Sequence, residues 1–489
     1  MNPTAFIAHC QTLLGTQYVL LEESDQSPYL RDWRNRYQGK ALAILLPQTT
    51  EQVAEIVKAC NQAKISLVPQ GGNTSMCGAA TPNDSGQQVV LNLKRMQTIR
   101  GIDASNQTIV VEAGCILQTV QEAAKVQGFL FPLSLGAQGS CQIGGNLATN
   151  AGGTNVLRYG NARELCLGLE VVTAQGEIMQ GLRSLRKDNT GFDLRDLYIG
   201  SEGCLGIITA AVLKLFPLPT AQWTALVAVP DIPSTIDLLN LFQKRTAALL
   251  TGFEMMSRDS LDLTAKHFAQ MKNPLSNDPS YTILVELSDH ESEEHARNLM
   301  ESVLESAFET GLASDAVIAS NLSQAQSFWT MREHITMAQA QEGANLKHDI
   351  SLPISSLHAF IEETDGILRQ RFSGVRLINF GHLGDGNLHY NVAPPTGENP
   401  KEFNRSYEQV IHDVVYTQVE KHHGSISAEH GIGQLKLPDL EAHRGPVAHQ
   451  LMRSIKQALD PNNILNPGKV LAGNAAHTLL LSVIRIRNG

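Results

Sequence analysis

Leu135 to Gly153 reads L-G-A-Q-G-S-C-Q-I-G-G-N-L-A-T-N-A-G-G and holds six glycines with almost no bulky side chains. Its polar side chains are the short ones of Ser140, Asn146, Thr149 and Asn150. A segment with so little side-chain surface cannot be stabilised by its own burial, so we expect it to wrap a partner that does the packing, such as a flat cofactor. The alternative is a flexible linker, although linkers rarely alternate glycine with isoleucine and leucine.

Two further glycine-rich loops lie on either side of this segment. Upstream, a predicted strand at residues 65–68 opens into P-Q-G-G-N-T-S-M-C-G, Pro69 to Gly78. Amides and hydroxyls in such a loop can donate to phosphate oxygens, although a simple turn would have the same composition. The loop is not the G-x-G-x-x-G dinucleotide fingerprint. Downstream, Leu185 to Thr209 is a third glycine-punctuated loop that returns to a strand.

Regular elements are predicted around these loops. Residues 49–61 form an amphipathic helix, with Gln52 placed for a capping box. Further strands are expected at residues 41–46, 89–93 and 108–113, and helices near the N-terminus and at residues 117–127.

Length and composition narrow the class of protein. A chain of 489 residues is expected to form two or three domains. The formal net charge of −10 argues against nucleic-acid binding. The seven cysteines lack C-x-x-C spacing, which predicts buried thiols in a reducing compartment. Neither a leader nor an apolar run of membrane-spanning length is visible, so we expect a cytoplasmic protein, with peripheral membrane association left open.

The composition changes after F-P-L-P, residues 216–219, which marks a domain boundary. Two strand-helix-strand units follow, with helices predicted at residues 232–244 and 290–309. They predict an α+β domain with helices on one face of an antiparallel sheet. A further helix is expected at residues 327–340.

Near the C-terminal end, F-G-H-L-G-D-G-N-L-H-Y-N-V, residues 380–392, places His382 and His389 on either side of a tight turn. If the flanking strands form a hairpin, the two imidazoles converge. Glu429 and His430 follow in S-I-S-A-E-H-G-I-G. Two histidines and a carboxylate are a full set of protein ligands for a divalent metal with an open position, and by ligand type zinc, manganese or iron would suit. The alternative is a turn with structural histidines.

Three polar side chains precede this metal-site candidate. Arg332 and Thr336 lie one turn apart on the helix predicted at residues 327–340, and Lys347 follows in K-H-D-I-S-L-P. Brought together, they would bind one or two carboxylates. The alternative is a solvated charged face.

The motifs P-Q-G-G-N-T, G-S-C-Q-I-G-G-N-L-A-T-N-A-G-G, R-K-D-N-T-G-F-D-L and G-S-E-G-C-L-G-I-I-T resemble the FAD-binding half of the vanillyl-alcohol oxidase type flavoproteins. The branch they are most similar to contains D-2-hydroxyglutarate, D-lactate and glycolate dehydrogenases. The resemblance implies an α+β fold: a two-part FAD-binding domain and an α+β cap domain with an antiparallel sheet. The domains expected are residues 1–217 for FAD, 218–433 for substrate and metal, and 434–489 returning to the FAD domain.

The resemblance also implies roles for residues in both halves. Pyrophosphate would be held by Gln70, Gly71, Gly72, Asn73, Thr74 and Ser75. The flavin would be lined by Gly136, Ser140, Gly145, Asn146, Thr149, Asn150, Gly203, Ile207 and Asn466. The metal, zinc by resemblance, would be bound by His382, His389 and Glu429. Substrate would contact Arg332, Thr336, Lys347, Asn391 and His430. Of sixteen histidines His9 alone precedes residue 267, so FAD is expected to be noncovalent.

The resemblance implies oxidation of a D-2-hydroxy acid, for which His430 would be the base and FAD the hydride acceptor. Two cations suit D-2-hydroxyglutarate, and D-malate, better than D-lactate, although a D-lactate or glycolate dehydrogenase is the alternative. A metallohydrolase and an electron-transfer subunit are rivals from other classes. An electron-transfer flavoprotein or a quinone would accept electrons, and a homodimer would be unsurprising. The tail after Lys469 is expected to be an added edge strand or a disordered end.

Overall fold

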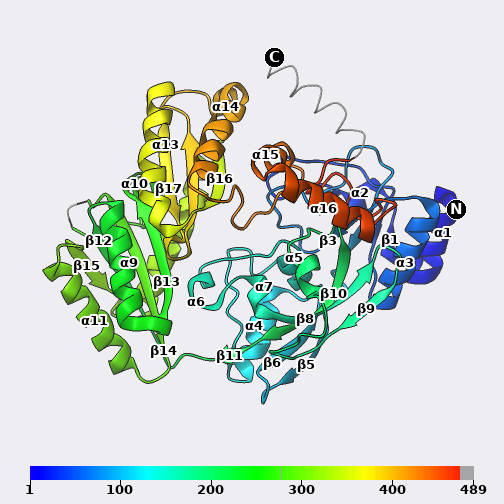
Figure 1. The fold of residues 1–489 in the computed structure, drawn as a ribbon, viewed down its shortest axis with the longest axis horizontal. Helices are drawn as coiled ribbons and strands as arrows, with labels where there is room; N and C mark the ends of the chain where they lie inside the picture. The colour runs from blue at the N-terminus through cyan, green and yellow to red at the C-terminus, as the bar shows by residue number, and fades with distance from the viewer. Residues whose placement is uncertain (277, 474–489) are drawn as a thin grey trace.

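The computed structural model describes residues 1–276 and 278–473 of the chain. The fold combines helices with mixed and antiparallel sheets, as predicted for an α+β protein. Figure 1 shows two lobes: one carries a seven-stranded sheet, and the other carries two smaller sheets. The expected tail from residue 474 onward lies outside the described residues.

The first sheet of the smaller-sheet lobe has four strands in the order β1-β2-β4-β3. They are β1 (Val19–Leu20), β2 (Ala43–Leu45), β4 (Val89–Asn92) and β3 (Leu67–Gln70). The last three run parallel, and β1 runs antiparallel to β2. Helices α1 (Pro3–Leu14) and α3 (Thr50–Ala63) pack together beside this sheet, and the short α2 (Glu23–Gln26) lies between them in sequence.

Helix α3 shows why the local sequence folds this way. Thr49 caps its first turn by accepting from the Gln52 amide, and Val53, Ile56 and Val57 are buried along one face. The predicted capping box is not formed, because the Gln52 side chain accepts from the amide of Gln48, one residue before the cap.

The second sheet of this lobe is antiparallel, in the order β5-β6-β10-β8-β9. Its strands are β5 (Ile99–Asp103), β6 (Thr108–Glu112), β10 (Gly206–Lys214), β8 (Cys166–Thr173) and β9 (Ile178–Gly181). The helices between them are α4 (Leu117–Val126), α5 (Ile143–Ala148), α6 (Val156–Tyr159), α7 (Ala162–Leu165) and α8 (Arg195–Tyr198). A two-stranded pair, β7 (Phe129–Leu130) with β11 (Phe216–Pro217), lies where the chain leaves the lobe.

The other lobe is built on a sheet that is antiparallel throughout, in the order β15-β12-β14-β13-β17-β18-β16. Its strands are β15 (Asp315–Ile318), β12 (Ala221–Val229), β14 (Tyr281–Asp289), β13 (Leu250–Ser257), β17 (Arg376–Gly381), β18 (Asn387–Ala393) and β16 (Leu346–Ser351). The predicted hairpin around His382 and His389 is therefore present as β17 and β18.

Helices cover both faces of this sheet. The core of one face contains α9 (Ile232–Thr246), α11 (Glu293–Glu309), α13 (Leu357–Arg371) and α14 (Pro400–Lys421). Helices α10 (Arg258–His267) and α12 (Leu322–Glu342) pack on the opposite face. The prediction of helices on one face is correct for α9 and α11 but incomplete for the domain, because α12 also buries Phe328, Met331 and Ile335 against the sheet.

Strand alternation divides the side chains of this sheet. Along β13, Phe253 and Met255 belong to the core under α9, whereas Glu254 and Met256 point to the opposite face. That opposite face carries buried polar side chains as well as apolar ones, and it is the face turned toward the smaller-sheet lobe, as the cavity described below shows.

The chain returns to the smaller-sheet lobe at its end. Helices α15 (Leu437–His443) and α16 (Pro446–Leu459), orange-red in Figure 1, lie beside that lobe. The amide of Leu67 in β3 donates to Ile464 at 2.8 Å, and the amide of Asn466 donates back to Leu67 at 2.7 Å. These bonds place the closing segment at the edge of the four-stranded sheet.

Candidate active site

A cavity of about 990 Å³ lies between the two lobes. On one side it is lined by the glycine-rich loops, and on the other by the polar face of the seven-stranded sheet together with α12. The sequence indicated the residues of both walls, but it did not indicate that the two walls face each other. The structure brings them together in one space.

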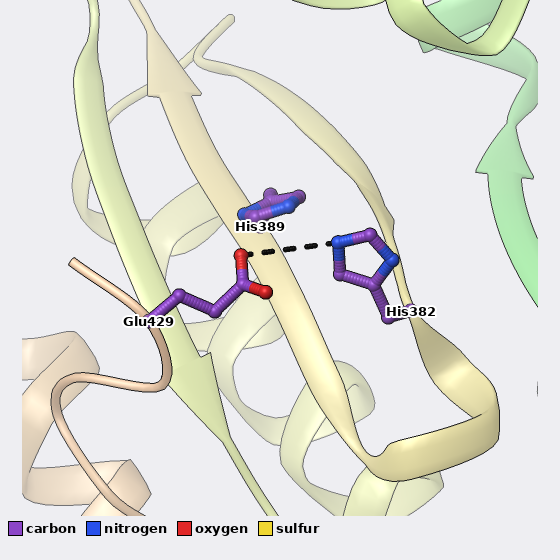
Figure 2. Close-up of side chains that lie close together, drawn as sticks. All are labelled: His382, His389 and Glu429. Carbon is purple, nitrogen blue, oxygen red and sulfur yellow. Dashed lines mark ion pairs between the residues drawn. The ribbon is translucent and has the colours of Figure 1, made fainter. Parts of the chain in front are cut away.

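His382, His389 and Glu429 converge at this cavity (Figure 2). His382 follows β17, His389 lies on β18, and Glu429 comes from the segment after α14. One ligand atom from each lies within 4.8 Å of the others, and Nε2 of His382 is 3.8 Å from a Glu429 oxygen. Two imidazole nitrogens and a carboxylate at this separation fit a divalent cation with an open position.

Each imidazole of this set has a carboxylate behind it. The Glu254 carboxylate lies 2.6 Å from Nδ1 of His382, and an Asp349 oxygen lies 3.7 Å from Nδ1 of His389. The hydrogen bond to Glu254 fixes the tautomer of His382 and leaves its Nε2 to face the metal, whereas Asp349 acts on His389 through its charge. The donor chemistry of the three residues therefore fits a metal ion.

The charges of the set are strongly perturbed. Burial alone would lower the pKa of His382, but Glu254 and Glu429 raise it to about 9. Burial raises the pKa of Glu429 to about 7, helped by Asp349 and opposed by His382. Burial lowers the pKa of His389 well below its ordinary value. A buried carboxyl group whose pKa is raised in this way favours a positive charge beside it, and a metal cation can take the position of the proton.

His430 lies beside this group and lines the same cavity. An oxygen of Asp349 lies 3.5 Å from Nδ1 of His430, and the same oxygen accepts from the amides of Glu429 and His430, at 2.9 Å each. Burial lowers the pKa of His430, which favours the neutral imidazole that a general base requires.

The predicted carboxylate-binding side chains also line the cavity: Arg332, Thr336 and Lys347. Nε of Arg332 donates to Glu254 at 2.8 Å. Lys347 has no acidic partner in residues 1–276 and 278–473, and burial together with the nearby Arg34 charge lowers its pKa to about 8. A partly buried cation without a partner is a place for an anionic group.

Asn391, the remaining predicted substrate residue, lines the cavity from β18. Its amide donates to Oε1 of Gln339 on α12 at 3.0 Å. This bond ties the sheet to the helix that carries Arg332 and Thr336.

The glycine-rich wall has the shape of a cradle for a flat group. A Cβ at Gly72 would lie 2.1 Å from the Ser140 carbonyl oxygen, so the first two loops touch backbone to backbone. At Gly136 and Gly145, by contrast, a Cβ would meet nothing within 4 Å, because both face open space. Ser140 and Thr149 lie on the same wall.

Several buried polar atoms of this wall have no hydrogen-bond partner within the part of the chain that the structure describes. They are Oγ of Ser75, Oε1 of Gln142 and Oδ1 of Asn146. Buried groups of this kind are normally satisfied, so their presence on the cavity wall fits a polar cofactor. Together with the open glycines, they fit FAD.

Most of the predicted cofactor residues line the cavity: Gln70 through Ser75, Gly136, Ser140, Gly145, Asn146, Thr149, Gly203 and Ile207. The Gln70 side chain donates to the carbonyls of Tyr29 and Ala80 and thus shapes the loop. Asn150 and Asn466 are not part of the cavity wall. Asn150 accepts from the Arg163 amide, and Asn466 donates to Ala79 and Glu202 carbonyls.

One contact joins the two walls directly. A Cβ at Gly152, in the glycine-rich segment of the smaller-sheet lobe, would lie 2.5 Å from Oε1 of Glu429. The segment predicted to wrap a flat cofactor therefore touches a predicted metal ligand.

Sequence reasoning missed the carboxylates that support the site: Glu202, Glu254 and Asp349. Two had a signal. Asp349 follows Lys347 by two residues on a strand and must share its face, and Glu254 is a lone acid within the apolar run T-G-F-E-M-M. Nothing in the sequence indicated Arg34, whose charge lowers the pKa of Lys347 and of His430.

Comparison with family models matches both parts of the chain. Residues 41–181 match the FAD binding domain, and residues 218–470 match the C-terminal domain of FAD linked oxidases.

Individual relatives cover nearly the whole chain. The mitochondrial D-2-hydroxyglutarate dehydrogenase of Arabidopsis thaliana is 38% identical over 95% of this chain and 81% of its own length. A Schizosaccharomyces pombe protein, named provisionally a mitochondrial D-lactate dehydrogenase, is 36% identical over 92% of this chain and 85% of its own length. The crystal structure of p-cresol methylhydroxylase superposes with a TM-score of 0.75 and 20% identity, over 96% of each chain, and supports the fold.

Proposed function

The chain belongs to the FAD-linked oxidases and is an FAD-dependent oxidoreductase, and from that premise we propose that it oxidises D-2-hydroxyglutarate to the 2-oxo acid with the help of a divalent metal. The observation that carries this proposal is the contact between Gly152 and Glu429, which supports a metal beside the cofactor cradle. D-Malate, a shorter dicarboxylate, is a second substrate under this proposal.

FAD would lie noncovalently along the glycine-rich loops, against Gly136 and Gly145, and when bound it supplies the hydride acceptor. The unpartnered oxygens of Ser75 and Asn146 support polar contacts with it. The histidines that line the described cavity all come from the other wall: His348, His382, His389 and His430.

A divalent metal bound by His382, His389 and Glu429, most suitably zinc, supplies Lewis-acid stabilisation of the deprotonated hydroxyl. His430 takes the hydroxyl proton. The charge of Asp349, 3.5 Å from its Nδ1, favours the imidazolium that forms when His430 accepts that proton. Loss of this proton and of the C2 hydride converts the alcohol into the 2-oxo acid.

Arg332, Thr336 and Lys347 hold the carboxylates of the substrate. Arg332 is fixed by its Nε bond to Glu254, which also supports His382, so substrate binding and the metal site share one buried anchor. Asn391, fixed by Gln339, lines the same space beside His389. Two cations in one cavity favour a dicarboxylate over lactate.

Within the described residues no helix is both long and apolar enough to cross a membrane. We infer that electrons pass to an electron-transfer flavoprotein or a quinone. The cytoplasmic location, with or without peripheral membrane association, and a homodimer remain proposals as well.

A dye-reduction assay with D-2-hydroxyglutarate, D-malate, D-lactate and the matching L-acids tests the substrate. We expect the highest kcat/KM with D-2-hydroxyglutarate. A clear preference for D-lactate would replace this proposal with the D-lactate dehydrogenase alternative. A colourless protein that releases no FAD on denaturation would exclude the oxidoreductase.

A further inference from the structure

Two buried carboxylates from different lobes hold the loop Glu429 to Gly433. Asp349 of β16 accepts from the amides of Glu429 and His430. Glu202 of the smaller-sheet lobe accepts from two further amides of the loop: Oε1 from Ile432 at 2.7 Å, and Oε2 from Gly433 at 2.8 Å. Four backbone donors of one loop are thus shared between two acids.

The backbone of Glu202 is fixed in the cofactor wall. Its amide donates to the Ala148 carbonyl of the glycine-rich segment at 2.8 Å, and its carbonyl accepts from the Asn466 side chain at 2.7 Å. Its φ of +52° lies in the left-handed region, which a glutamate adopts at a cost. A costly conformation that persists indicates that the surrounding contacts require it.

The loop approaches Glu202 as closely as glycine allows. A Cβ at Gly431 would lie 2.7 Å from Oε1 of Glu202, and Gly431 itself has φ +76°. Both carboxylate oxygens of Glu202 are therefore committed to the loop, and no other residue type offers two acceptors at that reach.

The Glu202 carboxylate is buried, and no cation lies within salt-bridge distance in the part of the chain that the structure describes. Burial raises its pKa, while the two loop amides and the more distant charges of Lys436 and Lys469 oppose that rise. Lys436 donates to the Ile426 carbonyl instead. Burying a carboxylate without a direct cation partner costs free energy. The hydrogen bonds from the two loop amides are what offset that cost at Glu202.

We propose that Glu202 is a positioning residue that aligns Glu429 and His430 with the flavin-binding wall. The inference rests on the proposed function, because it takes Glu429 as a metal ligand and His430 as the base. The Ala148 and Asn466 contacts tie the backbone of Glu202 to the cofactor wall, while its side chain ties the loop. Glu202 thereby links the loop to the cofactor wall, next to the bonds that the Gln434 and Leu435 amides donate to the Cys77 carbonyl.

Glu202→Gln tests the proposal, because an amide can accept from one of the two loop N–H groups but meets the other with its own N–H. Glu170→Gln is the matched control. Glu170 is a buried glutamate of the same lobe that accepts from Thr50 and Arg100, away from the cavity. Glu202→Asp keeps the charge but shortens the reach by one methylene, and it serves if the glutamine variant does not fold.

Three measurements on the flavin-containing protein separate the outcomes. Amide hydrogen exchange of the peptide covering residues 427–434, in metal-free protein, should be at least about tenfold faster in Glu202→Gln. Calorimetric zinc titration should give a Kd about 10- to 100-fold higher, as for other partners of metal ligands. The visible flavin spectrum should be unchanged. Glu202→Asp should fall between the wild type and Glu202→Gln, and Glu170→Gln should match the wild type in all three.

Wild-type exchange and zinc affinity in Glu202→Gln would overturn the proposal, as would loss of flavin with an unchanged loop. The exchange measurement requires neither metal nor turnover. If the wild type binds neither zinc, manganese nor iron, the proposed metal site fails, while exchange still decides whether Glu202 holds the loop.

Discussion

The two walls of the cavity differ in kind. Within the described residues, the glycine-rich wall contributes a single charged side chain, Glu202, whereas the opposite wall contributes Glu286, Arg332, Glu333, Lys347, Asp349 and Glu429 with four histidines. The first wall binds with backbone groups and short polar side chains that can approach a flat molecule closely. The second places charges where a proton and an anion must be handled. Under the proposed function, one lobe binds the cofactor and the other carries out the chemistry.

The largest effect is expected from a substitution that changes the charged wall and leaves the glycine-rich wall intact. Glu429→Gln should lower kcat by about 10³-fold, because loss of a metal ligand removes several kcal/mol of transition-state stabilisation. Flavin content, measured by visible absorbance, should be that of the wild type. Glu333→Gln, an exposed neighbour on the same wall, should retain activity. Loss of flavin from Glu429→Gln would show that the walls do not work separately.

A second substitution separates substrate binding from the metal. Lys347→Met should lower kcat/KM for D-2-hydroxyglutarate by about 30-fold or more, since a truncated charge partner of a carboxylate costs about 2 kcal/mol or more. The thermal midpoint should not fall, because burial already disfavours the Lys347 charge in the free protein.

D-Lactate provides the comparison for this variant, because it has one carboxylate. Its kcat/KM should change less than that of D-2-hydroxyglutarate. Equal losses on both substrates would place Lys347 at the shared carboxylate or outside the site.

A substitution in the glycine-rich wall gives the converse test. Gly72→Ala places a methyl group against the Ser140 carbonyl and forces two loops apart, at a cost of about 1–3 kcal/mol. FAD affinity should fall by about tenfold or more, while zinc affinity is kept. Gly101→Ala, where an added Cβ meets nothing, is the control. Weakened zinc binding with intact flavin would reverse the assignment of the walls.

The smallest expected effect concerns stability rather than the site. The hydrogen bond from Lys266, with those from His267 and Arg376, lowers the pKa of Glu342 at the end of α12 to about 2, from an ordinary value of 4.5. A depressed pKa stabilises the fold above the ordinary value, and the contribution is lost as the pH falls toward 2. Glu342→Gln should therefore cost about 1 kcal/mol near neutral pH and less as the pH falls below 4.5.

Thermal melts of Glu342→Gln between neutral pH and pH 3 measure this effect. Glu309→Gln, on an exposed position of α11, should leave the midpoint unchanged. A difference between Glu342→Gln and wild type that grows toward acid pH would contradict the assigned sign.

The sequence predicted those parts of the site whose residues lie close together along the chain. The turn between His382 and His389 carries its own glycines, so the hairpin follows from local conformation. Glu429 and His430 are adjacent, and Arg332 and Thr336 are one helical turn apart. In each case the spacing along one element determines the spacing in space.

The unpredictable part depends on register between distant elements. Glu254 reaches His382 because β13 pairs with β17, and 128 residues separate the two side chains. Glu202 meets the loop at Ile432 across 230 residues. Asn150 and Asn466, predicted to line the flavin, lie outside the described cavity wall and bond backbone groups nearby, which motif position alone does not reveal. The second helical face of the large sheet was missed because α12 was not assigned to a side.

The central claim is that metal and flavin share one cavity but are held by separate walls. Its most direct test is removal of the metal with a chelator from purified protein, followed by anaerobic addition of D-2-hydroxyglutarate. We expect the flavin to remain bound and oxidised after stripping, and to be reduced once zinc is restored. Full reduction of the flavin by the substrate in metal-free protein would contradict the account.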